Sequence, residues 1–220
     1  MPFAMPELIL LDSLPKTKRD LVGRATNRTS EHIREACKFG ELYFDGPREY
    51  GYGGFWYDGR WQTVAAALID HYSLKPGDRV LDVGCAKGFL VQDLLAKGID
   101  ATGIDISDYA VAKRTPEVKD RLMVGNAISL PFSDNCFKCV ISLDTIHNLS
   151  KDCAQAALSE IQRVSSGNAY IRVDSYHSTK QKQIFEGWAL TAKFHDYPDG
   201  WLQLFHQAGY TGDYCWTIIE

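Results

Sequence analysis

The feature that most constrains the fold is an alternation of short β-branched runs with helical segments, which begins at Pro76 and continues to the end of the chain. Runs such as Val80–Val83 and Val140–Leu143 are typical of central parallel strands that helices cover on both faces. The alternation predicts strands near Arg79–Val83, Ala101–Ile106, Leu122–Gly125, Cys139–Leu143, Ala169–Asp174 and Tyr214–Ile219. It therefore predicts an α/β fold with a doubly wound, mostly parallel sheet.

Composition limits the classes of protein that the chain can belong to. Its 220 residues, 45% of them apolar, can bury a hydrophobic core as one domain or as one domain with an appendage. The 24 Lys and Arg residues against 28 Asp and Glu residues give a formal net charge of −4. This balance argues against a protein that neutralises many phosphates, so we expect no nucleic-acid partner.

The N-terminal apolar stretch and the cysteines indicate where the protein resides. Leu8–Leu11 is too short to span a bilayer or to serve as a secretory signal, because Asp12 and a charged run from Lys16 to Asp20 follow it. The six cysteines have no regular spacing, and a chain of this size needs no disulfide staples, so free thiols are expected. We therefore expect a cytoplasmic protein with no membrane partner.

The segment Tyr43–Trp61 follows neither a helical nor a strand period. Its nineteen positions hold eight aromatic residues and five glycines. Glycines permit sharp turns and rigid aromatic rings offer a large contact area, so this composition predicts an irregular cap rather than a linker. The chain is accordingly divided into an N-terminal helix and aromatic, glycine-rich cap at 1–61 and an α/β domain at 62–220.

The most informative motif is Val80–Phe89, where a buried strand leads into a turn of small residues and then into a helix. Backbone amides at such a turn suit a polar, partly negative ligand group, and Gly84 and Gly88 permit its close approach. The second strand ends in Asp105, whose carboxylate at the neighbouring strand end can accept two hydrogen bonds from a ribose diol. Together these features predict a nucleotide-type ligand at one edge of the sheet.

An acidic residue before a small-residue turn, with a second acidic residue at the end of the next strand, resembles the class I S-adenosylmethionine-dependent methyltransferases. The resemblance is to small-molecule enzymes of the methyltransferase-11/25 type and covers about Pro76 to the C-terminus. It includes Val124–Ala127, Leu130–Phe132 and Phe137–Leu143 in the expected order. The resemblance implies a Rossmann-like methyltransferase fold, S-adenosylmethionine as cofactor and S-adenosylhomocysteine as product.

The family pattern also implies a set of cofactor contacts. The residues at the matching positions are Asp82, Gly84, Cys85, Ala86, Gly88, Asp105, Ile106, Asn126, Ala127 and Leu143. By resemblance, Asp82 and Gly84 lie near the amino-acid end of the cofactor, Asp105 lies at the ribose hydroxyls, and the residues at 106, 126 and 127 surround the adenine. Ala86 stands where glycine is commonest and Asn126 where aspartate is commonest.

Two other functions stay open at this point. A nicotinamide-dependent oxidoreductase would want Gly-x-Gly-x-x-Gly, and the turn Gly84–Gly88 does not have that spacing. A catalytically degenerate S-adenosylmethionine-binding subunit that regulates a partner is consistent with Ala86 and Asn126. Use of the cofactor for another group transfer is a variant of the enzyme hypothesis.

Methyl transfer displaces a neutral thioether from a sulfonium carbon, so the protein must chiefly align donor and acceptor and exclude water. His147, just past the fourth strand, is the candidate catalytic residue, because its ordinary pKa suits proton transfer at neutral pH. It lies at the edge where ligands bind in open α/β sheets. Asp174, Tyr176 and His177 follow the fifth strand at that edge and are candidate substrate contacts.

The cap is expected to close over the same mouth as a lid that excludes water. Its candidate substrate contacts are Tyr50, Tyr52, Trp56 and Tyr57. Arg48 and Arg60 are candidate anchors for an acidic group of the substrate. A hydrophobic cluster that merely plugs one end of the sheet is the alternative interpretation of the same segment.

No metal site is expected, because Cys136 and Cys139 have no second pair of ligands at a spacing typical of zinc sites. The predicted function is transfer of a methyl group from S-adenosylmethionine to a small-molecule acceptor beneath an aromatic lid.

Overall fold

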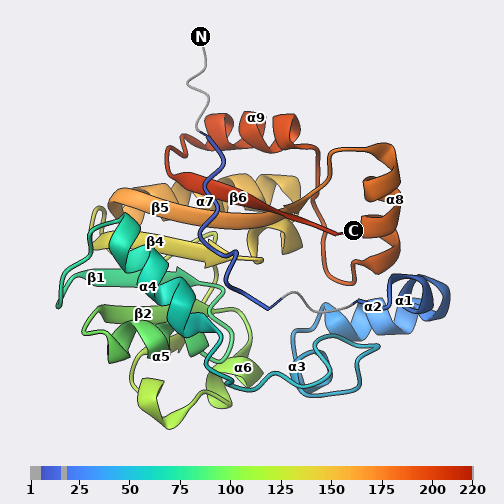
Figure 1. The fold of residues 1–220 in the computed structure, drawn as a ribbon, viewed down its shortest axis with the longest axis horizontal. Helices are drawn as coiled ribbons and strands as arrows, with labels where there is room; N and C mark the ends of the chain where they lie inside the picture. The colour runs from blue at the N-terminus through green and yellow to red at the C-terminus, as the bar shows by residue number, and fades with distance from the viewer. Residues whose placement is uncertain (1–5, 16–18, 220) are drawn as a thin grey trace.

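The computed structural model describes residues 6–15 and 19–219 (Figure 1). In this part of the chain the strands are β1 (Arg79–Val83), β2 (Asp100–Asp105), β3 (Leu122–Val124), β4 (Phe137–Leu143), β5 (Ser165–Ser175) and β6 (Asp213–Ile218). The α-helices are α1 (Leu21–Asn27), α2 (Ser30–Ala36), α3 (Glu41–Phe44), α4 (Trp61–His71), α5 (Phe89–Ala96), α6 (Asp108–Ala112), α7 (Lys151–Val164), α8 (Thr179–Trp188) and α9 (Pro198–Ala208). Short 3-10 turns occupy Pro116–Val118 and Ile146–Asn148.

The described strands form one sheet in the order β3-β2-β1-β4-β5-β6, with every neighbouring pair parallel. The chain builds the sheet outward from β1 to β3 and then returns to place β4 on the other side of β1. The carboxyl ends of β1 and β4 therefore flank the point where the strand order reverses, and ligands bind there in open α/β sheets. The predicted doubly wound α/β fold is confirmed, and all the described strands are parallel rather than most of them.

The sheet is buried between two helical layers because successive strand residues point to opposite faces. Leu81 and Val83 face a core cluster with α7 and α9, whereas Val80 faces a second cluster with α4 and α5. Figure 1 shows these helix pairs on the two sides of the sheet. Burial on both faces explains why the central strands are apolar throughout rather than alternating.

The N-terminal part of the chain contributes to two different regions. Residues 7–14 run across the sheet (Figure 1), where Leu11 is buried and the Leu8 carbonyl accepts a hydrogen bond from the Tyr170 hydroxyl at 2.8 Å. Helices α1, α2 and α3 gather instead at one end of the sheet. The predicted irregular segment Tyr43–Trp61 contains the end of α3 and otherwise turns and coil before α4.

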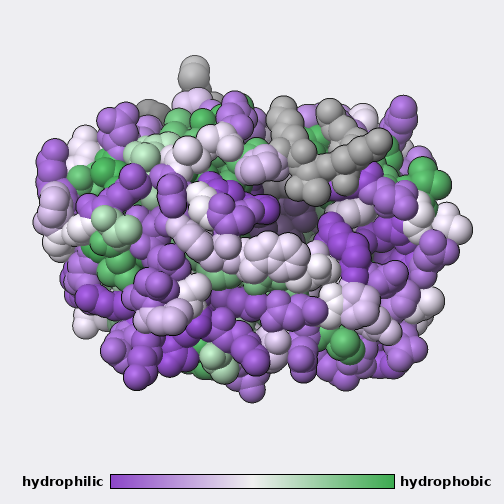
Figure 2. All heavy atoms as spheres, turned by 60° about the horizontal axis from the view of Figure 1, so that its bottom comes forward, coloured by the Kyte–Doolittle hydropathy of each residue, from purple (hydrophilic) through white to green (hydrophobic). Residues whose placement is uncertain are grey.

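The surface is mostly hydrophilic on the face drawn in Figure 2, with hydrophobic residues in small separate groups. No helix in the described ranges is both long enough and apolar enough to cross a bilayer. All six cysteines lie within the described residues and are free thiols.

Candidate functional site

The turn after β1 is the first element of the site. Gly84 has a φ of +83°, and a Cβ added to it would lie 2.0 Å from Oγ1 of Thr145, so no other residue fits this position. Ala86 also has a positive φ, +49°, and its amide donates a 2.7 Å hydrogen bond to the Asp105 carboxylate. A left-handed alanine is strained, so this hydrogen bond helps to hold the turn in its shape.

Asp105 joins this turn to the end of β2. One carboxylate oxygen accepts the Ala86 amide, and the other accepts the Ser107 amide at 2.8 Å. Burial raises the pKa of Asp105, while these backbone hydrogen bonds act in the opposite direction. The residue is only 9% exposed, yet a carboxylate has about four acceptor positions, so it keeps the capacity to accept from a ligand hydroxyl.

A cavity of about 340 Å³ lies at this edge and is called the first cavity. It brings together seven of the predicted cofactor contacts, which come from four strand ends: Gly84, Ala86, Asp105, Ile106, Asn126, Ala127 and Leu143. Residues far apart in sequence thus converge where the parallel strands end. The turn at 84 and the carboxylate at 105 lie on one rim, as the sequence predicts.

Three predicted cofactor contacts do not line the first cavity. Cys85 is buried with its sulfur against Gly103, and Gly88 begins α5 in a left-handed conformation. Asp82 is buried in β1, and burial together with the charge of Asp105 raises its pKa to about 7. These residues shape the strand and turn from behind rather than from the cavity surface.

The N-terminal helices add lining residues to the first cavity that were not among the predicted site residues. Cys37, Lys38 and Phe39 follow α2, and Tyr43 and Phe44 belong to α3. The aromatic density of 43–61 indicated a role for Tyr43 and Phe44. Nothing in the sequence of α2 indicated that the residues after it line a cavity. Tyr52 is the predicted cap residue that does line the cavity. The first cavity is also lined by residues that no sequence motif indicated, namely Thr145, Asn148, Leu149 and Lys193.

A second cavity of about 250 Å³ shares Tyr43 and Tyr52 with the first. Past these two rings it is lined by the carboxylates of Asp144 and Asp174 and by His147. Two ligands could therefore lie side by side at the strand ends. Tyr43 and Tyr52 would border both of them.

His147 is 5% exposed and both of its ring nitrogens are engaged. The Asp174 amide donates to Nδ1 at 3.1 Å, which leaves the ring proton on Nε2, 3.2 Å from the Asp174 carboxylate. Burial raises the pKa of Asp174, whereas the neighbouring His147 acts in the opposite direction. The structure thus joins His147 and Asp174, two predicted site residues, into one hydrogen-bonded pair at the second cavity.

Of the predicted anchors and remaining substrate contacts, Arg48 also lines the second cavity, and the others lie outside both cavities. Tyr50 packs its ring against His32, and the Tyr57 hydroxyl donates to Asp93 of α5 at 2.6 Å. Tyr176 is buried in a separate cluster with Phe185 and Ile219. Trp56 and His177 are exposed, and Arg60 pairs with Asp58 beside it in the sequence. No described group of three or more His, Cys, Asp or Glu side chains could hold a metal ion.

Comparison with known proteins agrees with this geometry. Residues 81–173 match the family described as "Methyltransferase domain". The chain is 35% identical over 102 residues to demethylmenaquinone methyltransferase of Beutenbergia cavernae, which is 45% of this chain and 41% of that protein. It is 30% identical over 188 residues to botryococcene C-methyltransferase of Botryococcus braunii, or 77% of this chain and 48% of that protein. The chain therefore spans less than half of the length of these two relatives.

Among solved structures, the complex between the Haloferax volcanii Trm112 methyltransferase activator and a candidate methyltransferase contains a similar chain. The TM-score is 0.55 at 17% identity, and the match covers 88% of this chain and 77% of that one. At this identity the similarity concerns the fold alone. Residues 81–173 thus match a methyltransferase domain, and the fold is that of the class I S-adenosylmethionine-dependent methyltransferases.

Proposed function

We propose that the protein binds S-adenosylmethionine in the first cavity and transfers its methyl group to a small-molecule acceptor in the second. The observation that carries this proposal is the shared boundary at Tyr43 and Tyr52, which joins a cavity lined by Gly84 and Asp105 to one lined by Asp174. Donor and acceptor held in neighbouring cavities would meet without diffusing through solvent, which is the main requirement of a displacement reaction.

The residues present fit the cofactor. The first cavity, at about 340 Å³, lies within the size range of small-molecule sites. Asp105 has lone-pair capacity for a ribose diol, the turn at 84–86 would face the amino-acid end, and Ile106 with Asn126 would border the adenine. When bound, S-adenosylmethionine would supply an electrophilic methyl group on a sulfonium centre.

The pair of His147 and Asp174 is the proposed proton acceptor where the acceptor group is a hydroxyl. His147 would hold the Asp174 carboxylate in place through Nε2, and the raised pKa of Asp174 suits a group that gains a proton. Tyr43 and Tyr52 would exclude water and align the acceptor. Within the N-terminal part at 1–61, the helices and loops of 21–61 would serve as the cap, since residues 7–14 pack on the sheet of the proposed cofactor-binding domain at 62–220. An amine or thiolate acceptor would need alignment alone.

The acceptor class and location are also proposed here. The relatives named for demethylmenaquinone and botryococcene support a small-molecule acceptor. Six free thiols support a reducing compartment such as the cytoplasm.

The proposed function is tested in two steps. S-adenosylhomocysteine at 100 times its Kd should stabilise the protein by about 2.7 kcal/mol, whereas NAD should leave the melting temperature unchanged. Incubation with S-adenosylmethionine labelled in its methyl group and a metabolite extract should then yield a labelled product. No shift with the adenosyl ligand would contradict the proposal. Binding without transfer to any extract would indicate the regulatory subunit instead.

Asp105→Ala should weaken binding of S-adenosylhomocysteine by about tenfold or more, because it removes at least one hydrogen bond to a charged acceptor. Isothermal titration calorimetry measures the change. Asp108→Ala is the matched control, since Asp108 is exposed in the first turn of α6, three positions further along, and lines none of the cavities described above. Equal Kd values for the two variants would contradict the role of Asp105.

A further inference from the structure

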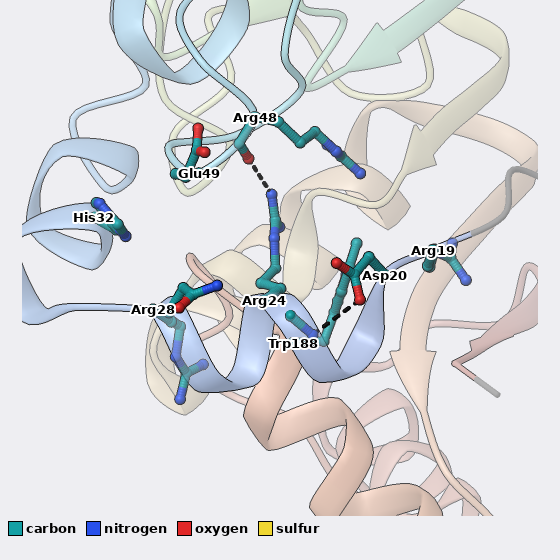
Figure 3. Close-up of a pocket in the computed structure, with 10 residues that line it drawn as sticks. Arg19, Asp20, Arg24, Arg28, His32, Arg48, Glu49 and Trp188 are labelled. Atoms are coloured by element: carbon teal, nitrogen blue, oxygen red, sulfur yellow. Dashed lines mark hydrogen bonds between the residues drawn. The ribbon is translucent and has the colours of Figure 1, made fainter.

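Three arginine side chains surround one tryptophan on the cap side of the second cavity. The guanidinium carbons of Arg19, Arg24 and Arg48 lie 5.8, 4.3 and 5.4 Å from the ring centroid of Trp188. Figure 3 shows Arg24 rising from α1 so that its guanidinium reaches the backbone carbonyl of Arg48, on the loop after α3. These four residues are called the arginine cluster.

Neither Arg24 nor Arg48 has a carboxylate partner among the described residues. Arg24 donates to the backbone carbonyls of Arg48 and Gly51, the latter at 3.0 Å, and Arg48 also donates to the Gly51 carbonyl. Burial and the neighbouring charge of Arg48 lower the pKa of Arg24 to about 10. A guanidinium has five N–H donors, so several donors of each side chain stay available. The fold therefore holds repelling cations together with neutral acceptors.

Nearby acidic groups offset the positive charge of the cluster only in part. Asp20 accepts the Gly23 amide at the start of α1, at 2.9 Å. Glu49 lines a hollow together with the cluster but forms no ion pair in the described structure, and Arg28 adds a fourth positive charge there. The hollow, a third cavity of about 300 Å³, is thus lined by four arginines and only two carboxylates.

The arginine cluster belongs to the third cavity and also to the second. Arg19, Arg24, Arg48 and Trp188 line both. The second cavity continues past His147 to Tyr43 and Tyr52, which border the first. A ligand group held by the cluster would therefore be attached to a molecule whose other end reaches the edge of the first cavity.

We propose that the arginine cluster binds a phosphoryl group of the methyl acceptor. This inference rests on the proposed function, because it assigns the substrate class of the same site. A carboxylate needs one guanidinium fork, whereas a phosphoryl group offers three oxygens and up to two negative charges to several forks at once. The acceptor is then a phosphorylated small molecule whose anionic end lies at Trp188 and whose reactive end lies near Asp174.

Inorganic pyrophosphate is the probe, because it carries the chemistry without the unknown remainder. Calorimetric titration of the full chain should show saturable 1:1 binding that weakens as KCl is raised from about 50 to 500 mM. Arg48→Gln and Arg24→Gln should each weaken binding by about tenfold or more. Arg34→Gln removes the same charge from an exposed position on α2 and should leave the Kd unchanged. Citrate should bind at least tenfold more weakly than pyrophosphate.

The outcomes separate this inference from the proposed function. Binding of S-adenosylhomocysteine without binding of pyrophosphate would overturn the arginine-cluster assignment alone, as would equal losses in Arg48→Gln and Arg34→Gln. Preference for citrate would overturn the phosphoryl class. Binding of pyrophosphate without S-adenosylhomocysteine would overturn the proposed function. Each variant must retain the wild-type melting temperature and affinity for S-adenosylhomocysteine. If both glutamine variants unfold, the inference is tested instead by pyrophosphate binding to Arg48→Lys and by the salt dependence of binding to the wild type.

A second readout uses the natural acceptor. Metabolite extract is separated on an anion-exchange resin, and each fraction is incubated with the labelled cofactor. Label should enter molecules from the retained, anionic fraction. Labelling confined to the unretained fraction would overturn the inference while leaving methyl transfer itself established.

Discussion

At the scale of single residues, Asp82 shows how strongly the sheet perturbs a carboxyl group. It is buried at the end of β1, and burial together with the nearby Asp105 charge raises its pKa to about 7. In an unfolded chain an aspartate has a pKa near 3.9. The folded protein therefore binds one proton more than the unfolded chain between about pH 4 and pH 7. The stability contributed by this group is complete below about pH 4 and is lost as pH rises through about 7.

Asp82→Asn should remove this pH dependence. A shift of one pKa unit corresponds to about 1.4 kcal/mol. The free energy of unfolding of the wild type should therefore fall by about 2–4 kcal/mol relative to the variant between pH 4 and pH 8. Urea unfolding of both proteins across that range measures the difference, in which the titrating groups that do not couple to Asp82 cancel. Parallel stability curves would show that Asp82 ionises normally in the folded protein.

At the scale of elements, single charged side chains join parts that are distant in sequence. Lys87, in the turn after β1, donates to both carboxylate oxygens of Asp45 at 2.6 and 2.7 Å and to the Phe55 carbonyl at 2.7 Å. Asp45 also accepts the Tyr109 hydroxyl of α6 at 2.8 Å. These contacts connect the segment after α3 to the turn that borders the first cavity.

Lys87→Met should release the segment 45–60 without unfolding the sheet. The variant keeps the apolar stem but loses the three contacts, which should destabilise the segment locally by about 1–2 kcal/mol, because Lys87 is buried while Asp45 stays partly exposed to water. Limited proteolysis should therefore cut within 45–60 at least about tenfold faster than in wild type. Lys97→Met is the control, because Lys97 is exposed just after α5. Unchanged cleavage in Lys87→Met would show that the ring contacts hold the segment by themselves.

A second connection joins the ends of three strands. Asp144, just after β4, accepts Nε of Arg172 in β5 at 2.9 Å and the Thr217 hydroxyl in β6 at 3.1 Å. Burial acts to raise the pKa of Asp144, but the Arg172 charge and hydrogen bonds outweigh it and lower the pKa. The pair thus stabilises the edge that carries the second cavity.

Arg172→Met should destabilise the protein by about 2 kcal/mol, because it leaves the Asp144 carboxylate without its charge partner in a partly exposed site. Denaturant unfolding measures the loss. The double variant Asp144→Asn/Arg172→Met should recover part of it, since the orphaned charge is then removed as well. Additive losses in the double variant would mean that the two side chains act independently.

At the scale of the whole molecule, apolar periodicity was sufficient to predict the sheet and the edge that carries the site. The strands are short and buried on both faces, so each appears in the sequence as a short run of apolar residues. The site residues outside the motif could not be predicted in the same way. Lys87 and Asp45 are 42 positions apart, and Arg24 meets Arg48 only because α1 packs beside the loop after α3. Such contacts depend on how the N-terminal helices fold over the sheet, and no local pattern encodes it.

This arrangement predicts how the molecule responds to its cofactor. The segment 37–52 supplies six residues of the first cavity, whereas α9 supplies none to any of the three cavities described above. A ligand that binds only when this segment is closed stabilises the closed state by RT ln(1 + [L]/Kd). At 100 times its Kd, S-adenosylhomocysteine should therefore slow amide hydrogen exchange in 37–52 by about 100-fold. Exchange by local fraying in 198–208 should not change.

Hydrogen exchange with peptide-level mass spectrometry distinguishes the two ways in which the cap could contribute. A segment that opens separately gives protection confined to 37–52 and the strand ends, because only its own opening releases the ligand. A segment fixed to the sheet opens only when the whole protein unfolds, so protection would extend equally into α9 and β6. Confined protection would establish 37–52 as a lid, and uniform protection would establish it as part of the folded core. Full occupancy of the ligand with no protection of 37–52 would place the cofactor outside the first cavity.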